Sequence, residues 1–284
     1  YDISITEPYF NNKPLSFTTN IYSSFTDPSS ANYETEDIGF GIRSSFPLSV
    51  DRYLEIRYSL YTAKIKANAN ATAYENALAG TDTVSNLGYS LAFDKRNSRY
   101  KPSKGFNLVL NQDLAGLGGN SYYYKNSFEF NTYKRLSNSF IGAYKLQAGN
   151  INGYNDKYAP LSSNFKLGGK ELRGFKSGKI GPKFGNSYTG GQYYYLTSLE
   201  TNIDLNIDAF DITTTLFIDV GSVWGLEDPA YGAINDDHES RSSIGLNFNW
   251  DSAIGPINIV YAKIIESNKN DTTDNLYFDI GYNF

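Results

Sequence analysis

The stretch LYFDIGYNF, residues 276–284, decides the fold class because its residues alternate strictly between two kinds. Period-two alternation is typical of a β-strand that shows one apolar face and one polar face. A strand of this length, at about 3.3 Å per residue and tilted by about 40°, is long enough to cross the core of a membrane. The apolar face carries Leu276, Phe278, Ile280, Tyr282 and Phe284.

The same alternation returns in two earlier segments, residues 216–221 and 244–250. In the first, Leu216, Ile218 and Val220 alternate with Phe217, Asp219 and Gly221. A soluble β-sandwich would show this periodicity too, with the apolar face turned inward. The polar faces of these strands are rich in Gly, Asn, Ser and Thr and nearly free of Lys and Glu. We expect such a face in the crowded lumen of a barrel, with the apolar face toward lipid.

The composition supports a membrane barrel and excludes several other classes of protein. The 25 Tyr, 18 Phe and 2 Trp make the chain 16% aromatic, and Tyr and Trp gather at the two membrane interfaces. Mean hydropathy is −0.44, and no apolar run approaches the ~18 residues that a transmembrane helix needs. A net charge of −5 argues against a nucleic-acid partner. The absence of Cys excludes disulfides, Cys-ligated zinc and a cysteine nucleophile.

Counting the alternating segments gives about thirteen strands, joined alternately by short turns and long loops, as in outer-membrane barrels. The strands are expected near 1–9, 14–25, 33–46, 51–63, 84–95, 104–113, 121–135, 138–149, 191–205, 210–224, 240–251, 256–264 and 275–284. Bacterial single-chain barrels close with even numbers of strands. We therefore predict one all-β domain over residues 1–284, an antiparallel transmembrane barrel with about 13 of a presumed 16 strands. Within the loop 64–83, the Ala-rich residues 67–79 suggest a short helix.

The longest connection, residues 150–190, contains the Gly- and Lys-rich run FKLGGKELRGFKSGKIGPK between Phe165 and Lys183. A loop of this length in a compact protein is usually functional or disordered. We expect Gly168, Gly169 and Gly174 to permit its sharp turns. A phosphate-binding loop is excluded, since no Gly-Lys-Ser/Thr follows and no helix begins there.

Part of this run, Leu172, Arg173, Gly174 and Phe175 followed by Ile180, Gly181 and Pro182, resembles the VRGF…IGP motif of the BamA family of outer-membrane protein assembly factors. Other segments resemble the same family in the same order and together cover nearly all of the chain. They are ITEPYF (5–10), FDKRNSRYKPSKG (93–105), FIDVGSVW (217–224), GLNFNWDSAIGPINIVYA (245–262) and the terminal Phe284. Ala253 stands where the family usually has Pro. The POTRA domains and the first three strands of the family barrel have no counterpart here.

The resemblance implies that the long loop folds down into the lumen and that Arg173 contacts acidic residues of the inner wall, Glu200 and Asp219. The residues themselves agree in part, because Asp219 lies on the strand face opposite Ile218. A buried carboxylate needs a partner, and Arg offers a planar, bidentate donor set. The alternative is a solvated loop charge. Phe175 is expected to pack against the inner wall, the alternative being a loosely held loop aromatic.

By resemblance, the chain inserts and folds β-barrel proteins in the bacterial outer membrane through a lateral seam beside its last strand. The implied partners are outer-membrane lipids, unfolded outer-membrane protein clients and accessory assembly lipoproteins. An exposed edge at residues 275–284 would be a template for β-augmentation; the plain alternative is that this strand only closes the barrel. Two other functions stay open: a translocation pore, either FhaC-like or TamA-like, and a diffusion porin, which would have no lumen-plugging loop.

The sequence gives no sign of an enzyme, a cofactor or a metal site. The sole histidine, His238, follows two aspartates at 236–237, and a solvated acidic loop is the favoured interpretation. One His does not make a zinc triad, and no nucleophile motif lies beside it. Asp94, Arg96 and Arg99 are expected to form a salt-bridged turn. We predict no catalytic residues.

Overall fold

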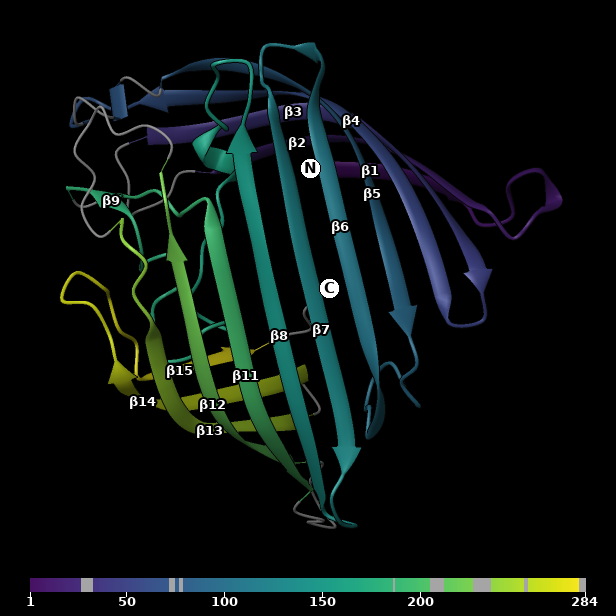
Figure 1. Cartoon of the computed structure of the whole chain (residues 1–284), viewed down its shortest axis with the longest axis vertical. Coiled ribbons are helices and arrows are strands. Elements are labelled where there is room, and N and C mark those ends of the chain that lie inside the picture. The colour runs from purple at the N-terminus through teal and green to yellow at the C-terminus, as the bar shows by residue number, and fades with distance from the viewer. Residues whose placement is uncertain are drawn as a thin grey trace.

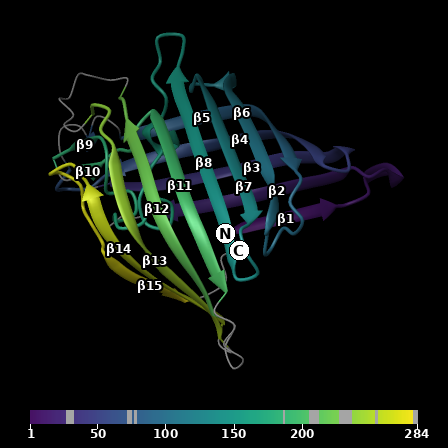
Figure 2. The same ribbon diagram turned by 60° about the horizontal axis from the view of Figure 1, so that its bottom comes forward.

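A single antiparallel sheet of thirteen strands forms the wall of the molecule in the computed structural model (Figure 1). The structure describes residues 1–26, 33–71, 75–76, 79–185, 187–204, 212–226, 236–252 and 255–280. The sheet curves around the long loop, which lies on its concave side (Figures 1 and 2). None of the helical segments in these ranges has the length and apolar character needed to cross a membrane.

Neighbouring strands in space are neighbours in sequence, except that β8 pairs with β11. Among the described residues, β1 and β15 are the two edges of the sheet. The strands are β1 (Asp2–Glu7), β2 (Ser16–Thr26), β3 (Tyr33–Ser49), β4 (Arg52–Ala67), β5 (Gly80–Asp94), β6 (Lys104–Gly119), β7 (Tyr123–Arg135), β8 (Phe140–Gly153), β11 (Tyr193–Asp204), β12 (Ile212–Trp224), β13 (Arg241–Ser252), β14 (Gly255–Glu266) and β15 (Leu276–Ile280). Short 3-10 helices cover Phe10–Asn12 and Leu161–Ser163.

The thirteen predicted strands are all present, but several extend further than the sequence indicated. Strand β4 continues to Ala67 and β5 begins at Gly80, so the loop expected over 64–83 is reduced to 68–79. The ladder continues here, with Ile65 opposite Gly80, although residues 80–83 are Gly, Thr, Asp and Thr and show no alternation between apolar and polar side chains. Within the expected Ala-rich helix, Glu75 and Asn76 are helical, whereas residues 72–74 and 77–78 lie outside the described part. The long connection also contains two unpredicted two-residue strands, β9 (Lys183–Phe184) and β10 (Ser187–Tyr188).

The apolar face of the sheet points outward, as the barrel prediction requires. On β12, Leu216 and Ile218 are 46% and 42% exposed, whereas Phe217 and Asp219 on the other face are 2% and 0% exposed. A soluble sandwich would bury the first pair, so the structure excludes that alternative. Leu276 and Phe278 of β15 are exposed in the same way. The side chain of Ile280, and all of Tyr282 and Phe284, lie outside the described residues.

The inner face is more highly charged than the sequence analysis expected. The guanidinium of Arg57 on β4 lies 2.8 Å from a carboxylate oxygen of Asp113 on β6. Further along the same sheet, Lys145 Nζ of β8 lies 2.8 Å from Glu200 Oε2 of β11. These pairs connect different strands, so a single strand shows only one member of each. The polar faces of the three strands singled out in the sequence are nearly free of Lys and Glu, and these charged pairs lie on other strands.

The apolar core lies between the long loop and the inner wall. Loop residues Leu167, Leu172, Phe175 and Ile180 pack with Leu196 of β11 and Val223 of β12 into one buried cluster. A single curved sheet has no second layer to cover its inner face. The loop between β8 and β11 takes the place of that layer over this part of the wall (Figure 2).

Gly245 of β13 is required by close packing, and its replacement is expected to destabilise the barrel. A Cβ at this position would lie 2.1 Å from the Tyr261 carbonyl oxygen and 2.6 Å from Cζ of Phe217. Overpacking of this kind costs about 1–3 kcal/mol. We expect Gly245→Ala to lower the urea midpoint of unfolding, measured in lipid vesicles by the heat-dependent gel mobility of the folded barrel.

Gly80→Ala is the matched control, because a Cβ at Gly80 would meet nothing within 4 Å. Its midpoint is expected to stay close to that of the unmodified protein. Equal midpoints for the two variants would show that the packing around Gly245 is not restrictive.

Candidate functional site

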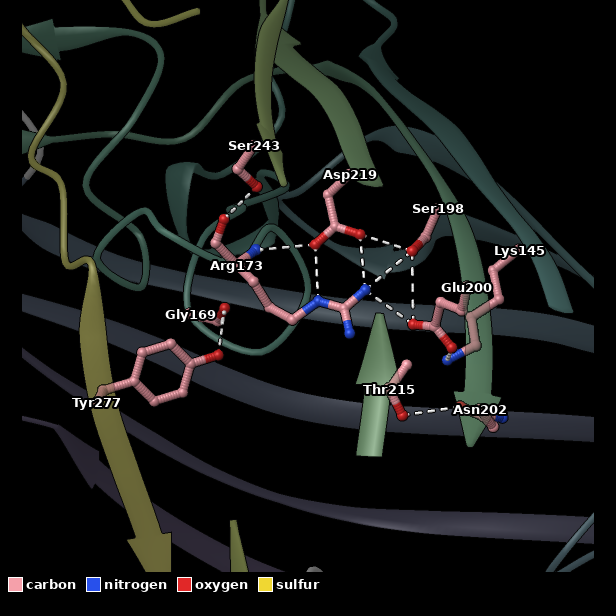
Figure 3. A network of polar contacts seen from close by, with 10 residues as sticks. All are labelled: Lys145, Gly169, Arg173, Ser198, Glu200, Asn202, Thr215, Asp219, Ser243 and Tyr277. Carbon is pink, nitrogen blue, oxygen red and sulfur yellow. Dashed lines mark hydrogen bonds and ion pairs between the residues drawn. The ribbon is translucent and has the colours of Figure 1, made fainter. Parts of the chain in front are cut away.

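Arg173 lies at the inner tip of the long loop and forms a bidentate ion pair with Asp219 of β12 (Figure 3). Its Nε donates to Asp219 Oδ2 at 2.7 Å, and Nη2 donates to Oδ1 at 2.7 Å. The backbone N–H of Arg173 also donates to Oδ2, at 3.2 Å. Asp219 is 0% exposed and Arg173 is 7% exposed. The contact that the sequence predicted is therefore present, and it is shielded from water.

Two further residues of β11 complete the side-chain contacts of the guanidinium. Arg173 Nη2 donates to Ser198 Oγ at 2.9 Å and to Glu200 Oε1 at 2.8 Å. Ser198 in turn donates to Asp219 Oδ1 at 2.5 Å. The register of the sheet produces this arrangement, because Ser198 is paired with Asp219 across β11 and β12. Glu200 lies two residues further along the same strand face.

The backbone of the loop tip is held by the next strand. Asp219 is paired with Ser243 of β13, and Ser243 Oγ donates to the carbonyl oxygen of Arg173 at 2.5 Å. Arg173 is thus bound at both its side chain and its main chain. Three adjacent strands, β11, β12 and β13, contribute to this one contact.

The charges in the cluster balance. Lys145 Nζ lies 2.8 Å from Glu200 Oε2, so two cations face two carboxylates. Burial alone would lower the pKa of Arg173, but the hydrogen bonds and charges of Asp219 and Glu200 raise it above its ordinary value. Arg173 is therefore a permanent cation here, and the two carboxylates are its ion-pair partners.

An aromatic ring lies directly under the guanidinium. The Cζ atom of Arg173 is 3.6 Å from the centroid of the Phe217 ring, within the range of a cation–π interaction. Phe217 is paired with Gly245 across β12 and β13. The absence of a side chain at Gly245 leaves room for the ring, so this glycine supports the Arg173 cluster indirectly.

The remaining residues of the loop motif are buried around Arg173. Leu172 and Phe175 are both 0% exposed, so the loosely held alternative for Phe175 is excluded. Gly174 has φ 94° and a Cβ there would lie 2.7 Å from Cδ1 of Ile264. Gly181 has φ 84°, a Cβ would lie 2.6 Å from Cγ1 of Val223, and both Gly181 and Pro182 are buried. The motif residues thus form a tight plug against the inner wall.

The loop also touches the last strand, a contact that the sequence did not indicate. Tyr277 Oη of β15 donates to the carbonyl oxygen of Gly169 at 3.1 Å (Figure 3). Next to it, the ammonium of Lys170 forms an ion pair with the Asp279 carboxylate. The loop with Arg173 therefore reaches the edge strand that the sequence analysis singled out.

Sequence reasoning missed Lys145, Ser198, Phe217 and Ser243 as members of the site. Two of them carried a usable signal. Ser198 lies two residues before Glu200, and Phe217 two residues before Asp219, so period two places each on the inner face beside a predicted partner. Lys145 and Ser243 depend on strand register, which the sequence of one strand does not reveal.

The two charged turns singled out in the sequence have structural contacts. Arg96 Nη2 lies 2.8 Å and Arg99 Nε 3.5 Å from Asp94 Oδ2, which confirms the salt-bridged turn. His238 is exposed but packs against aromatic side chains, with ring centroids 4.6 Å from Trp224 and 5.8 Å from Tyr195. Within the part of the chain that the structure describes, no group of three or more His, Cys, Asp or Glu is arranged to hold a metal ion.

The Arg173 cluster can bind a loop firmly inside a barrel, and the comparisons with known proteins fit this architecture. The chain is 26% identical over 264 residues to the outer membrane protein assembly factor BamA of Neorickettsia risticii, covering 91% of the chain and 35% of that protein. It is also 26% identical over 332 residues to BamA of Neisseria meningitidis serogroup B, covering 99% of the chain and 41% of that protein. The chain thus spans well under half the length of these relatives.

The fold is that of a known outer-membrane barrel. A crystal structure of BamA from Haemophilus ducreyi lacking POTRA domains 1–3 matches with a TM-score of 0.86 and 23% identity, over 98% of this chain and 60% of that one. This likeness and the curated relatives place the chain in the bacterial outer membrane. The model of the Omp85 superfamily domain matches residues 1–284. The chain therefore belongs to the Omp85 superfamily.

Proposed function

We propose that this chain is the barrel portion of an outer-membrane protein assembly factor, which inserts and folds β-barrel proteins in the outer membrane through a lateral seam. The observation that carries the proposal is the buried Arg173 cluster, which binds the long loop to the inner wall and brings it to the last strand. Both relatives described above are named as outer membrane protein assembly factors. This chain covers 35% and 41% of the length of these relatives, so their activity is proposed here.

The edge of the sheet supplies the physical basis for insertion. A backbone N–H or C=O without a partner in hydrocarbon costs several kcal/mol, so a client strand cannot enter the membrane alone. Strand β15 is an edge of the sheet among the described residues. A client strand that pairs with this edge satisfies its backbone groups by β-augmentation as it enters the lipid. The exposed apolar side chains of Leu276 and Phe278 then lie in line with those of the client.

The connection between β8 and β11, residues 154–192, which we call the lumen loop, gives this edge a support. Its bonds to β11, β12 and β13 hold it in place, and its contacts with Tyr277 and Asp279 extend that support to β15. A diffusion porin would keep its lumen open for solutes, whereas this loop occupies the lumen beside the wall. The proposed partners are unfolded barrel clients, outer-membrane lipids and accessory assembly lipoproteins, and the proposed activity makes or breaks no covalent bond.

Replacing Arg173 in the intact parent protein tests the function directly. Arg173→Ala leaves Asp219 and Glu200 buried without their main cation, a change that destabilises by roughly 3–5 kcal/mol. We expect the loop to leave the wall and the level of folded client barrels in the outer membrane to fall several-fold. The measurement is quantitative immunoblotting of heat-modifiable clients in cells that carry only the variant.

Arg99→Ala is the matched control, because the Arg99 side chain is 66% exposed and its contacts, an ion pair with Asp94 at 3.5 Å and a hydrogen bond to Tyr53 at 3.2 Å, lie at the surface. We expect it to leave client levels unchanged. Arg173→Lys should give a partial loss, since one ammonium does not replace a planar bidentate donor. Normal client levels in a strain with folded Arg173→Ala protein would reject the proposed function.

Two charged residues of the Arg173 cluster, Asp219 and Lys145, should differ in how much their replacement lowers the stability of the barrel. Asp219 is fully buried and accepts three bonds from Arg173, so Asp219→Asn should lower the urea midpoint of the barrel strongly. The Lys145 side chain is 39% exposed, and water screens such pairs to about 0–1 kcal/mol. We expect Lys145→Met to shift the midpoint only slightly. The reverse order would show that Lys145, and not Asp219, stabilises the cluster.

A further inference from the structure

A second buried arginine, Arg241, lies at the start of β13 and was not indicated by any sequence motif. Its Nε donates to Asp271 Oδ2 at 2.9 Å and its Nη2 to Oδ1 at 3.2 Å. Both side chains are 0% exposed. A third donor, Nη1, binds the carbonyl oxygen of Glu239 at 2.6 Å. A bidentate pair this deeply buried persists only where its geometry is closely satisfied.

Asp271 belongs to the connection between β14 and β15, residues 267–275, which we call the last loop. Its carboxylate accepts a bond from the backbone N–H of Asn268 at 2.8 Å. Its own backbone N–H donates to the carbonyl oxygen of Asn268 at 3.0 Å. The carboxylate that binds Arg241 therefore also shapes the turn in which it lies. Arg241 thus holds the last loop at its bend.

The last loop is bound to the lumen loop through backbone hydrogen bonds. The N–H of Lys176 donates to the carbonyl oxygen of Thr272 at 2.9 Å, and the N–H of Thr272 donates to the carbonyl oxygen of Lys179 at 3.0 Å. The N–H of Asp274 donates to the carbonyl oxygen of Gly174 at 2.9 Å. These bonds surround an isolated antiparallel bridge between residues 175 and 273. These bonds hold the two segments side by side and satisfy their backbone groups.

From the last loop the chain passes directly into β15, whose inner side chains touch the lumen loop as well. Tyr277 and Asp279 bind Gly169 and Lys170, respectively. The lumen loop, the last loop and β15 are therefore one connected unit. Within this unit, the pair of Arg241 and Asp271 is the ion pair that joins the last loop to the wall at β13.

We propose that Arg241 is a positioning residue: by holding Asp271, it fixes the last loop and thereby sets the position of β15 against the lumen loop. Arg173 has its own partners on β11 and β12. Loss of the Arg241 contact therefore removes the ion pair between the last loop and β13 and loosens the last loop and β15, while Arg173 remains bound. The consequence for client insertion rests on the proposed function, since only then is β15 the edge that receives a client strand.

A cross-link between the lumen loop and β15 reports this position. Lys170 and Asp279 are in contact, so a Lys170→Cys and Asp279→Cys pair in the intact protein, with any other cysteines replaced, should be joined in native membranes by a short bifunctional thiol cross-linker, which spans the gap left when the lysine side chain is shortened. Adding Arg241→Lys or Asp271→Asn should reduce the yield about five- to tenfold, the lower range for coupling between two sites. A Thr6→Cys and Thr18→Cys pair on β1 and β2, whose hydroxyls are 3.0 Å apart, should be joined equally in all backgrounds.

The double variant Arg241→Met with Asp271→Leu separates positioning from the simple burial of a charge. Removing both charges avoids a stranded ion, and buried pairs are often replaced in this way without loss of stability. We expect the folded fraction of the double variant, read from heat-dependent gel mobility, to equal that of the unmodified protein. The cross-link from residue 170 to residue 279 should stay as weak as in the single variants. Recovery of the cross-link in this variant, or an unchanged cross-link in Arg241→Lys and Asp271→Asn, would overturn the proposal.

Client levels in the same strains test the proposed function separately. A weak cross-link together with low client levels supports both ideas. A weak cross-link with normal client levels leaves Arg241 as the positioning residue for β15 and shows that insertion does not depend on that strand. The two outcomes are distinguishable because the cross-linking yield requires no client.

Discussion

A guanidinium buried inside a barrel must pair with carboxylates that lie at the same level of the wall, and the rest of this structure depends on that pairing. Arg173 finds Asp219 and Glu200 on adjacent strands, with Ser198 between them. The charges are too deeply buried to be solvated separately, so each group holds the others in place. The loop must therefore descend to the level of β11 and β12, and its glycines and apolar residues are arranged to let it do so.

The wall is adapted to the loop as much as the loop is adapted to the wall. Phe217 lies under the guanidinium and needs the space left by Gly245. Leu196 and Val223 project from the wall into the same apolar cluster as Leu172. A curved sheet with one face in lipid has its inner face uncovered, and the loop covers it here. The polar cluster positions the loop, and the apolar contacts fill the space around it.

Period-two alternation was enough to predict the strands and their outward faces, because lipid imposes one rule on every strand. Asp219 followed from its place opposite Ile218, whereas the partnership with Arg173 required the family resemblance. Strand ends were missed where chain segments such as residues 80–83 continue the ladder without alternating. Arg241 and Asp271 were missed for another reason. They are thirty residues apart, one at a strand end and one in an aperiodic loop, and no spacing rule connects such positions.

The two buried arginines act on the wall from different sides of β13. Arg173 binds side chains of β11 and β12 and reaches β13 only through Ser243, whereas Arg241 begins β13 and binds the loop that leads into β15. A disturbance of one pair therefore leaves most contacts of the other intact. The lumen loop is therefore attached to β11 and β12 independently of the ion pair that holds the last loop. In the proposed function, this independence lets the edge strand adjust its position to a client strand while the lumen loop stays on the wall.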